Sequence, residues 1–174
     1  MLEFEQLLSK YKNNVFNTCI GFVKNLTEAE DLSQEVFIEV YKKMNTFRGE
    51  SAIETWIYRI AVNKSLDLIR KNSRLKRKQA FSNTDIKNRE ALDLHHPGIV
   101  LEQKERATIL FRAIEKLPEK QRVAFTLQKL EGLSAIEIGK ILKRSSSSVE
   151  SLLFRARQNL KKELKTYYEK NELE

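Results

Sequence analysis

The residues with the clearest chemical potential lie in the stretch TWIYRIAVNKSLDLIRKNSRLKRK, at positions 55 to 78. It begins with two aromatic residues, Trp56 and Tyr58. From Arg59 to Lys78 it carries eight Lys or Arg residues against one Asp, a formal charge of +7. So much like charge on one helix repels itself unless an anion neutralises it. The stretch therefore indicates a surface for an anionic partner, with a solvated helix face as the alternative.

The aromatic end of this stretch allows two interpretations. Large aromatic residues at helical spacing commonly belong to a core, so Trp56 could pack against Phe37 and Tyr41. Tyr58 and Arg59 are expected at the surface instead.

A second chemically suggestive set lies between Ser134 and Arg157, which have the spacing of a DNA-binding helix-turn-helix. Gly139 sits where the two helices of such a motif approach closely, which explains a glycine that would otherwise weaken the helix. We expect the first helix to place mostly inward Ile136, Ile138, Ile141 and Leu142. Val149, Leu152 and Leu153 are expected to anchor the second helix.

The start of that second helix presents short hydrogen-bonding groups that suit the major groove. Ser serves several base edges, and Glu accepts a hydrogen bond from the cytosine amino group. Each serine is also a common helix cap, and a cap with a solvated turn is the alternative. The residues expected to face outward and contact DNA are Arg144, Ser146, Ser147, Ser148, Glu150, Ser151, Arg155 and Arg157. Lys161 and Lys162 are further candidates for the phosphate backbone.

Composition favours a basic, helical protein with an anionic partner. The 174 residues carry a net charge of +8, with a pI near 9.5, five Gly and two Pro. Cys19 is the single cysteine, which excludes an intramolecular disulfide and multi-cysteine metal sites. Adjacent His95 and His96 point in different directions and make a poor metal pair. With no Gly-rich phosphate loop or nucleophile motif, we expect no enzyme activity, no catalytic residue, no metal and no cofactor.

The elements needed to position these residues are all helices. Apolar residues recur at helical spacing from residue 3 to about 24. A second helix is expected behind a capping box from Thr27 to Glu30, and a third begins near Ile53. Residues 73 to 98 lose the apolar period and indicate a linker. Helices follow from Pro97, from Pro118 to Gly132, and from Ser134, where Glu137 completes a second capping box.

Fold class is therefore expected to be all-α: two small helical domains joined by a flexible linker, the C-terminal one containing a helix-turn-helix. The N-terminus has no signal pattern, and no apolar run reaches the roughly 20 residues that cross a bilayer. We expect a cytoplasmic protein without membrane insertion.

Two blocks of the chain resemble a known family. They are DLSQEVFIEVYKKMNTFRGESAIETWIYRIAVNKSLDLIRK and LPEKQRVAFTLQKLEGLSAIEIGKIL followed by SVESLLFRARQNLKK. Their order and spacing are similar to those of bacterial RNA polymerase sigma factors of the sigma-70 superfamily, extracytoplasmic-function type. The resemblance implies a region 2 domain at residues 1–78, a linker at 79–98 and a region 4 domain at 99–174.

The resemblance also implies partners and a division of labour. The first domain would dock on core RNA polymerase and open promoter DNA at the −10 element, while the second reads the −35 element as a duplex. An anti-sigma factor commonly holds such proteins inactive. The implied core-binding residues are Asp31, Gln34, Glu35 and Glu39, which on physical grounds alone form a solvated helix face.

Melted DNA would explain the basic aromatic stretch, because unpaired bases stack on aromatic side chains and cations neutralise the adjacent phosphates. The family's base-capturing loop corresponds to FRGESAIET, where Gly49 would let the backbone approach a nucleotide. The −10 candidates are Arg48, Gly49, Glu50, Ser51, Trp56, Tyr58, Arg59, Asn63, Lys64, Lys71 and Arg74.

One departure from the family concerns the recognition helix. Many relatives place Arg at its outward positions, where this chain has Glu150 and Ser151, so we expect an uncommon −35 sequence. The competing interpretation is a two-domain regulator that binds duplex DNA without polymerase. The aromatic, cationic helix argues against it, because a duplex binder does not need base-stacking groups far from its recognition helix.

Overall fold

The computed structural model describes residues 3–23, 26–81 and 101–171; side chains are described within these ranges except at 76–81, 101–107, 168, 170 and 171. Every regular element in the described ranges is a helix. The chain divides into two compact units, residues 1–93 and 94–174. This confirms the all-helical, two-domain class. The expected linker lies almost wholly outside the described residues, as do His95, His96 and Pro97.

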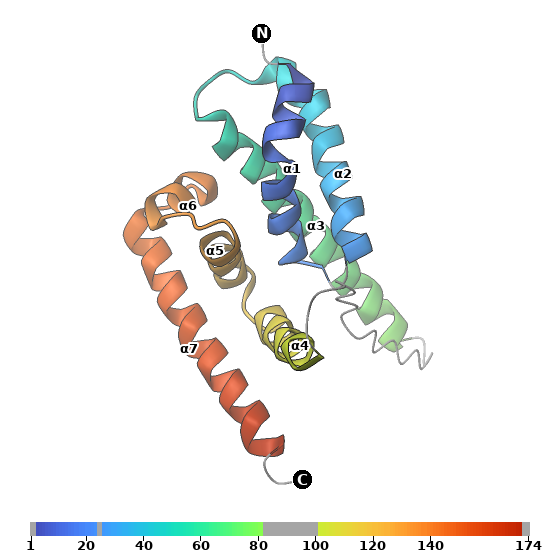
Figure 1. The fold of residues 1–174 in the computed structure, drawn as a ribbon, viewed down its shortest axis with the longest axis vertical. Helices are drawn as coiled ribbons and strands as arrows, with labels where there is room; N and C mark the ends of the chain where they lie inside the picture. The colour runs from blue at the N-terminus through green and yellow to red at the C-terminus, as the bar shows by residue number, and fades with distance from the viewer. Residues whose placement is uncertain (1–2, 24–25, 82–100, 172–174) are drawn as a thin grey trace. The chain divides into compact units, whose positions relative to one another are not determined.

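The first unit is built from three α-helices and one short 3-10 turn. They are α1 (Phe4–Ile20), α2 (Leu26–Lys43), η1 (Met44–Thr46) and α3 (Ile53–Phe81). Each of the three α-helices packs against the other two, and Figure 1 shows α1 and α2 side by side with α3 crossing them. The helix α3 continues to Phe81, through residues whose apolar period had faded in the sequence. Its charged end is therefore still helical.

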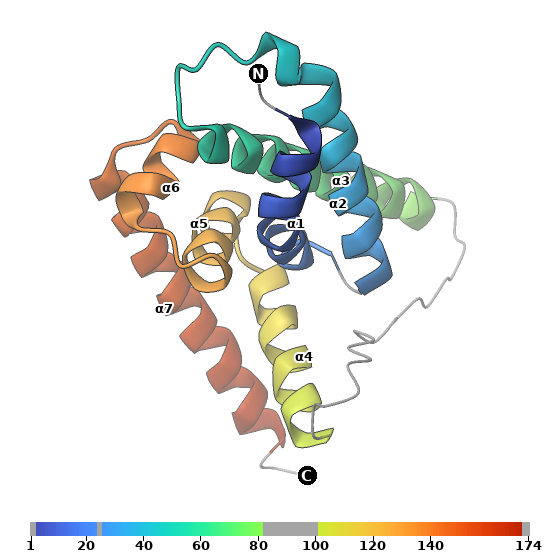
Figure 2. The same ribbon diagram turned by 45° about the horizontal axis from the view of Figure 1, so that its top comes forward.

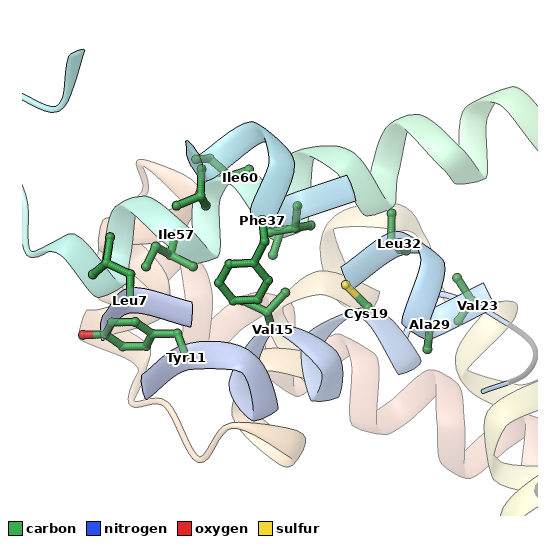
Figure 3. Close-up of a cluster of buried hydrophobic side chains, with 13 residues drawn as sticks. Leu7, Tyr11, Val15, Cys19, Val23, Ala29, Leu32, Phe37, Ile57 and Ile60 are labelled. Atoms are coloured by element: carbon green, nitrogen blue, oxygen red, sulfur yellow. The ribbon is translucent and has the colours of Figure 1, made fainter. Parts of the chain in front are cut away.

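The core of this unit forms where the apolar stripes of the three helices meet. Figure 3 shows the Phe37 ring of α2 reaching toward Val15 of α1, with Ile57 and Ile60 of α3 beside them. Cys19 is fully buried in the same cluster. Burial raises the pKa of the Cys19 thiol to about 12, against a smaller lowering by a hydrogen bond with Ser65. The cysteine therefore behaves as a small core residue.

The first turn of α2 differs from the sequence prediction. The helix begins at Leu26, so Thr27 lies inside the first turn and not at the N-cap position. The predicted capping box from Thr27 to Glu30 is therefore wrong, because it places the start of the helix too late in the chain. Helix ends are hard to place from sequence because propensities change little over one or two residues.

The second unit contains α4 (Leu101–Glu115), α5 (Glu119–Leu130), α6 (Ala135–Leu142) and α7 (Ser146–Asn171). The long helix α7 contacts all three others, and Figure 2 shows α4 running beside the C-terminal part of α7. Ala113 and Ile114 of α4 pack there with Leu160 of α7. Pro118 holds the N-cap position of α5, as predicted, and the buried Gln121 of α5 accepts a hydrogen bond from Asn159 at 2.8 Å.

The turn between α6 and α7 is tight. Lys143 follows α6 with φ 53 and ψ 52, a left-handed conformation that costs a residue with a Cβ about 1–2 kcal/mol. The Arg144 amide then donates to the Gly139 carbonyl at 2.9 Å. A Cβ on Gly139 would lie 2.7 Å from the Arg144 carbonyl oxygen. The predicted close approach at Gly139 is confirmed, and its partner is the turn itself.

Candidate nucleic-acid interface

The loop after η1 and the start of α3 together form a pocket of about 270 Å³. Gly49 takes φ +71 in this loop, a conformation that glycine adopts without strain. The pocket is lined by Thr46, Phe47, Arg48, Glu50, Ser51, Trp56 and Arg59. Five of these residues are predicted −10 contacts, so the structure brings together groups that are up to eleven positions apart in the chain. Thr46 and Phe47 were not predicted.

The position of Trp56 agrees with both interpretations of the sequence, a core residue and a residue that contacts a partner. It is half-buried and packs against the core of the first unit, yet it also lines the pocket. Its ring neighbour is Phe47, with centroids 5.2 Å apart, whereas the exposed Tyr41 stacks edge-on against Phe4 at 5.1 Å. The core thus fixes Trp56 in place while part of the side chain remains available to a ligand.

Tyr58 does not belong to this surface, and the expectation that it lies exposed is wrong. Its side chain is only 3% exposed. At about 100° per residue, Tyr58 points about 200° away from Trp56 around α3. The two rings therefore cannot line one face of the helix, and Tyr58 is removed from the candidate −10 residues.

An exposed cationic strip continues from the pocket along α3. Asn63, Lys71 and Arg74 are exposed and follow Trp56 at helical spacing. Lys64 is half-buried at the edge of this strip, with its ammonium 3.9 Å from Glu35 and 3.7 Å from Glu39 of α2. The predicted −10 residues thus reach the predicted polymerase-binding residues through Lys64.

The face of α2 that is predicted to dock on polymerase is exposed and has an apolar residue near its centre. Asp31, Gln34 and Glu35 are exposed. Ile38 is 53% exposed and lies one turn from both Gln34 and Glu35, a position that sequence reasoning missed. The signal was available: an isoleucine at i+4 from Gln34 falls on the polar side of α2 and not on its apolar stripe.

Glu39, at the edge of this face, has a pKa below its usual value. The largest cause is its hydrogen bond with Lys43, and the charges of Lys43, Lys64 and Lys42 act in the same direction against partial desolvation. Glu39 is therefore a carboxylate held among cations. A basic surface that docks here would compete with Lys43 and Lys64 for it.

A serine caps the start of each helix, α6 and α7, of the helix-turn-helix in the second unit. Ser134 caps α6: the Glu137 amide donates to its Oγ at 3.3 Å, and its own amide donates to the Glu137 carboxylate at 2.8 Å. The Ser134 hydroxyl also donates to the Glu137 carboxylate at 2.6 Å, and this bond, followed by the one from the Ser134 amide, lowers the pKa of Glu137. Ser145 caps α7, because its Oγ accepts from the Ser148 amide at 3.3 Å. The predicted cap at Ser134 is confirmed, and Ser145 takes the capping role in the serine run.

With Ser145 as the cap, the next serines stand on the first turn of α7 itself. Ser146, Ser147 and Ser151 are exposed, and Ser148 is partly so. Ser151 donates to the Ser147 carbonyl at 3.0 Å, and Ser148 accepts from Arg144 at 3.3 Å. The Ser147 hydroxyl also pairs with that of Ser145 at 3.2 Å. The serines predicted to meet DNA therefore share one end of the helix, and three of them already hold side-chain hydrogen bonds within the protein.

The outward face of α7 also carries an aromatic residue that sequence reasoning missed. Phe154 is 60% exposed. It lies one turn after Glu150 and one turn before Arg157, and both of these are exposed as predicted. Arg157 donates to Gln128 of α5 at 3.1 Å, and Arg155 donates to the Ser151 carbonyl at 3.2 Å. The apolar ring of Phe154 therefore lies among the polar residues of α7 that are predicted to contact DNA.

One residue of α6 also departs from expectation. Ile136 is 62% exposed, so its expected inward position is wrong. It is only the second residue of α6 and points about 200° away from the fully buried Ile138. Beside it lies an open, basic pocket of about 410 Å³, lined by Ile136, Gly139, Lys140, Lys143, Arg144, Ser145 and Ser146. Together with the start of α7, this pocket forms a positive rim suited to phosphate.

The described part of the chain contains neither a candidate metal cluster nor a candidate membrane span. No group of three or more His, Cys, Asp or Glu side chains is placed there to hold a metal ion. Among these same residues, no helix has both the length and the apolar character that crossing a bilayer requires.

Comparison with known proteins matches both units to one family. Residues 7–75 match the model of sigma-70 region 2, and residues 107–160 match that of sigma-70 region 4. The RNA polymerase sigma-H factor of Pseudomonas aeruginosa is 32% identical, over 92% of this chain and 86% of that protein. The ECF sigma factor SigW of Bacillus subtilis is 31% identical, over 93% and 89%. The ECF sigma-E factor of Escherichia coli K12 is 34% identical, over 89% and 83%.

Solved structures show the same fold. The sigma factor RpoE of Bartonella quintana, solved in complex with the anti-sigma factor NepR, is 24% identical with a TM-score of 0.70, over 93% of this chain and 96% of that chain. CnrH, solved with the cytosolic domain of CnrY, is 22% identical with a TM-score of 0.66, over 94% and 88%.

These matches define a class: a two-domain helical protein of transcription initiation. The chain belongs to the sigma-70 family of RNA polymerase sigma factors, and within it to the extracytoplasmic-function (ECF) type. Its function is that of a sigma factor, which directs promoter-specific initiation of transcription. The alternative of a regulator acting without polymerase is not favoured.

Proposed function

We propose that the first unit captures an unpaired base of the −10 element in the pocket beside Trp56, while the second unit reads the −35 element as duplex. The observation that carries this proposal is the gathering of Arg48, Glu50 and Arg59 around a half-buried aromatic ring. Cations there would hold phosphates, and the ring offers a stacking face. The exposed strip of Asn63, Lys71 and Arg74 would continue along the melted strand.

We further propose that the α2 face of Asp31, Gln34, Glu35 and Glu39 binds core RNA polymerase. Its exposed carboxylates suit basic residues, and Ile38 supplies an apolar centre of the kind found at protein interfaces. Catalysis would then belong to the core enzyme, and this chain would act in the cytoplasm without catalytic residue, metal or cofactor. An anti-sigma factor is a further proposed partner, as in the two complexes of similar fold.

The boundaries of the two functional domains stay a prediction. The matched spans of the family models lie within residues 1–78 and 99–174. Helix α3 continues three residues beyond position 78. Because residues 82–100 are outside the described ranges, the extent of the linker is proposed from the sequence alone.

Transcription in vitro tests the function as a whole. Purified protein is mixed with core polymerase and a promoter library, and the starts of the transcripts are sequenced. We expect co-elution with core and transcripts that share −35 and −10 elements. A protein that binds duplex DNA but neither co-elutes with core nor starts RNA synthesis would overturn the proposal in favour of a separate regulator.

Substitution of Trp56 tests the pocket. Trp56→Ala should slow DNA opening at the −10 element, followed by permanganate reactivity of unpaired thymines, and should leave −35 duplex binding unchanged. Tyr167→Ala removes an exposed aromatic residue of α7 and serves as the matched control. Equal DNA opening by wild-type protein and Trp56→Ala would exclude the ring from base capture.

A further inference from the structure

Lys64 stands between two surfaces that the proposed function assigns to different partners. It extends from α3, whose cations would follow the melted strand, toward Glu35 and Glu39 of the docking face on α2. Lys71 lies seven residues later on the same side of α3. Lys64 is thus the cation at which the DNA strip and the polymerase-binding face meet.

The geometry of the pairs favours exchange over permanent anchoring. Lys64 is 3.7 Å from Glu39 and 3.9 Å from Glu35, near the outer limit of an ion pair, and its side chain keeps a third of its surface exposed. Glu39 has a shorter pair with Lys43, at 2.6 Å. Long ion pairs that remain accessible to solvent contribute little to stability, so a stronger partner for either side can displace them.

We propose that Lys64 is an exchangeable counter-ion that couples polymerase docking to −10 DNA binding. In the free protein, Glu35 and Glu39 neutralise Lys64 and weaken its attraction for phosphate. Basic residues of the core that engage these carboxylates release Lys64 toward the melted strand. The coupling is reciprocal, because two ligands that share one equilibrium must raise each other's affinity by the same factor.

This inference rests on the proposed function and predicts the direction of two effects. Removing the two carboxylates should strengthen binding of single-stranded DNA by the free protein, because Lys64 is no longer neutralised. Removing Lys64 should strengthen binding of core polymerase, because Glu35 and Glu39 no longer have to break their ion pairs with Lys64 before they bind the core. From the range for exposed ion pairs, each effect should be about 1.5- to 5-fold.

The first experiment measures binding of a single-stranded −10 oligonucleotide by the free protein. Glu35→Gln with Glu39→Gln is compared with Glu30→Gln with Asp31→Asn, which changes the net charge equally on the same helix without touching Lys64. We expect a larger gain in affinity for the first pair of substitutions, and no difference between the pairs once Lys64→Gln is present in both. An equal gain, or a difference that persists without Lys64, overturns the proposal.

The second experiment titrates core polymerase with Lys64→Gln and, as control, with Lys71→Gln. Tighter binding by Lys64→Gln alone supports the exchange. Unchanged or weaker binding overturns it, and weaker binding would make Lys64 a residue that positions the carboxylates. Failure of the wild-type protein to initiate transcription with core would overturn the proposed function itself, whereas normal initiation with either negative result would reject only the exchange.

Discussion

At Phe154 the recognition helix exposes a ring among hydrogen-bonding groups, and a ring cannot read a donor or an acceptor. In the major groove the apolar feature that distinguishes one base from the others is the thymine methyl group. Phe154 follows Glu150 by one helical turn, so it would contact a base pair near the one that Glu150 contacts. The mixed polar and apolar face predicts thymine close to the position read by Glu150.

Uracil in place of thymine tests this contact. Removing the methyl group at the contacted position should weaken −35 binding by the wild-type protein about fourfold, since a buried methyl-sized group is worth about 0.8 kcal/mol. Phe154→Ala should bind thymine and uracil duplexes equally. Leu130→Ala, at another exposed apolar position, should keep the wild-type preference. A full uracil effect in Phe154→Ala would exclude this residue from readout.

Glu150→Ala should change which −35 sequences are selected more than it changes total DNA affinity. The carboxylate can accept from a cytosine amino group, but as an anion it adds nothing to phosphate attraction. Selection from a randomised −35 duplex library measures the preference, with Glu169→Ala on the same helix as control. An unchanged preference would remove Glu150 from the reading surface.

Individual residues show where prediction from sequence failed. Tyr58 and Ile136 lie on the opposite sides of their helices from those predicted, because residue type alone does not give the angle of a side chain around the helix axis. Phe154 was missed for a related reason: an aromatic residue in a helix is usually buried, and only the packing of α7 shows that this one is not. The exposure of the polar −35 and −10 candidates was easier to predict, because charged and small polar residues usually lie at the surface.

At the scale of elements, the close approach of α6 and the following turn depends on Gly139. Gly139→Ala would place a Cβ 2.7 Å from a backbone oxygen, and overpacking of this kind costs about 1–3 kcal/mol. The expected result is faster hydrogen exchange in α6 and the start of α7, with weaker −35 binding. Core binding through the first unit should remain.

Gly132→Ala is the matched control for this prediction. Its Cβ would meet no atom within 4 Å, so its cost arises only from a left-handed backbone at φ +66. It should leave −35 affinity at the wild-type level. If both substitutions reduced −35 binding equally, the close approach at Gly139 would not be the cause.

The face of α2 supports a second prediction at this scale. Asp31→Lys reverses a charge on an exposed side chain, so the fold should persist while binding to a basic surface on core polymerase weakens. Co-elution with core measures the loss, and Glu5→Lys on α1 provides the same charge change elsewhere. Full co-elution of Asp31→Lys would remove Asp31 from the docking face.

The elements themselves were largely predictable, because their apolar residues repeat at helical spacing and Pro118, Gly132 and Ser134 punctuate the second unit. The errors lie at the ends of helices. The TEAE sequence predicts a cap at Thr27, but α2 begins one residue earlier, and the loss of the apolar stripe predicts an earlier end for α3 than Phe81. A charged helix end gives no periodic signal.

At the scale of the whole molecule, a net charge of +8 makes binding to nucleic acid sensitive to salt. Lys71→Ala with Arg74→Ala should weaken binding of a single-stranded −10 oligonucleotide. It should also reduce the slope of log affinity against log salt by about 1.4, for two phosphates of a single strand. Titrations at several salt concentrations measure this slope.

Lys161→Ala with Lys162→Ala is the control, because it removes the same charge from the second unit. It should leave the single-strand slope unchanged and lower the slope for −35 duplex. If both pairs of substitutions reduced the single-strand slope alike, the +8 charge would act as a diffuse field and not as two separate surfaces.

The left-handed backbone of Lys143 lowers the thermal stability of the second unit below the value that its fold allows. Its backbone conformation would suit Gly or Asn better, yet the chain keeps a long cationic side chain there, beside the basic pocket. Lys143→Gly should therefore raise the melting temperature of the protein while reducing its hold on duplex DNA. At this position a gain in thermal stability would then reduce promoter affinity. Substitutions that are meant to stabilise this sigma factor should therefore be made at other positions.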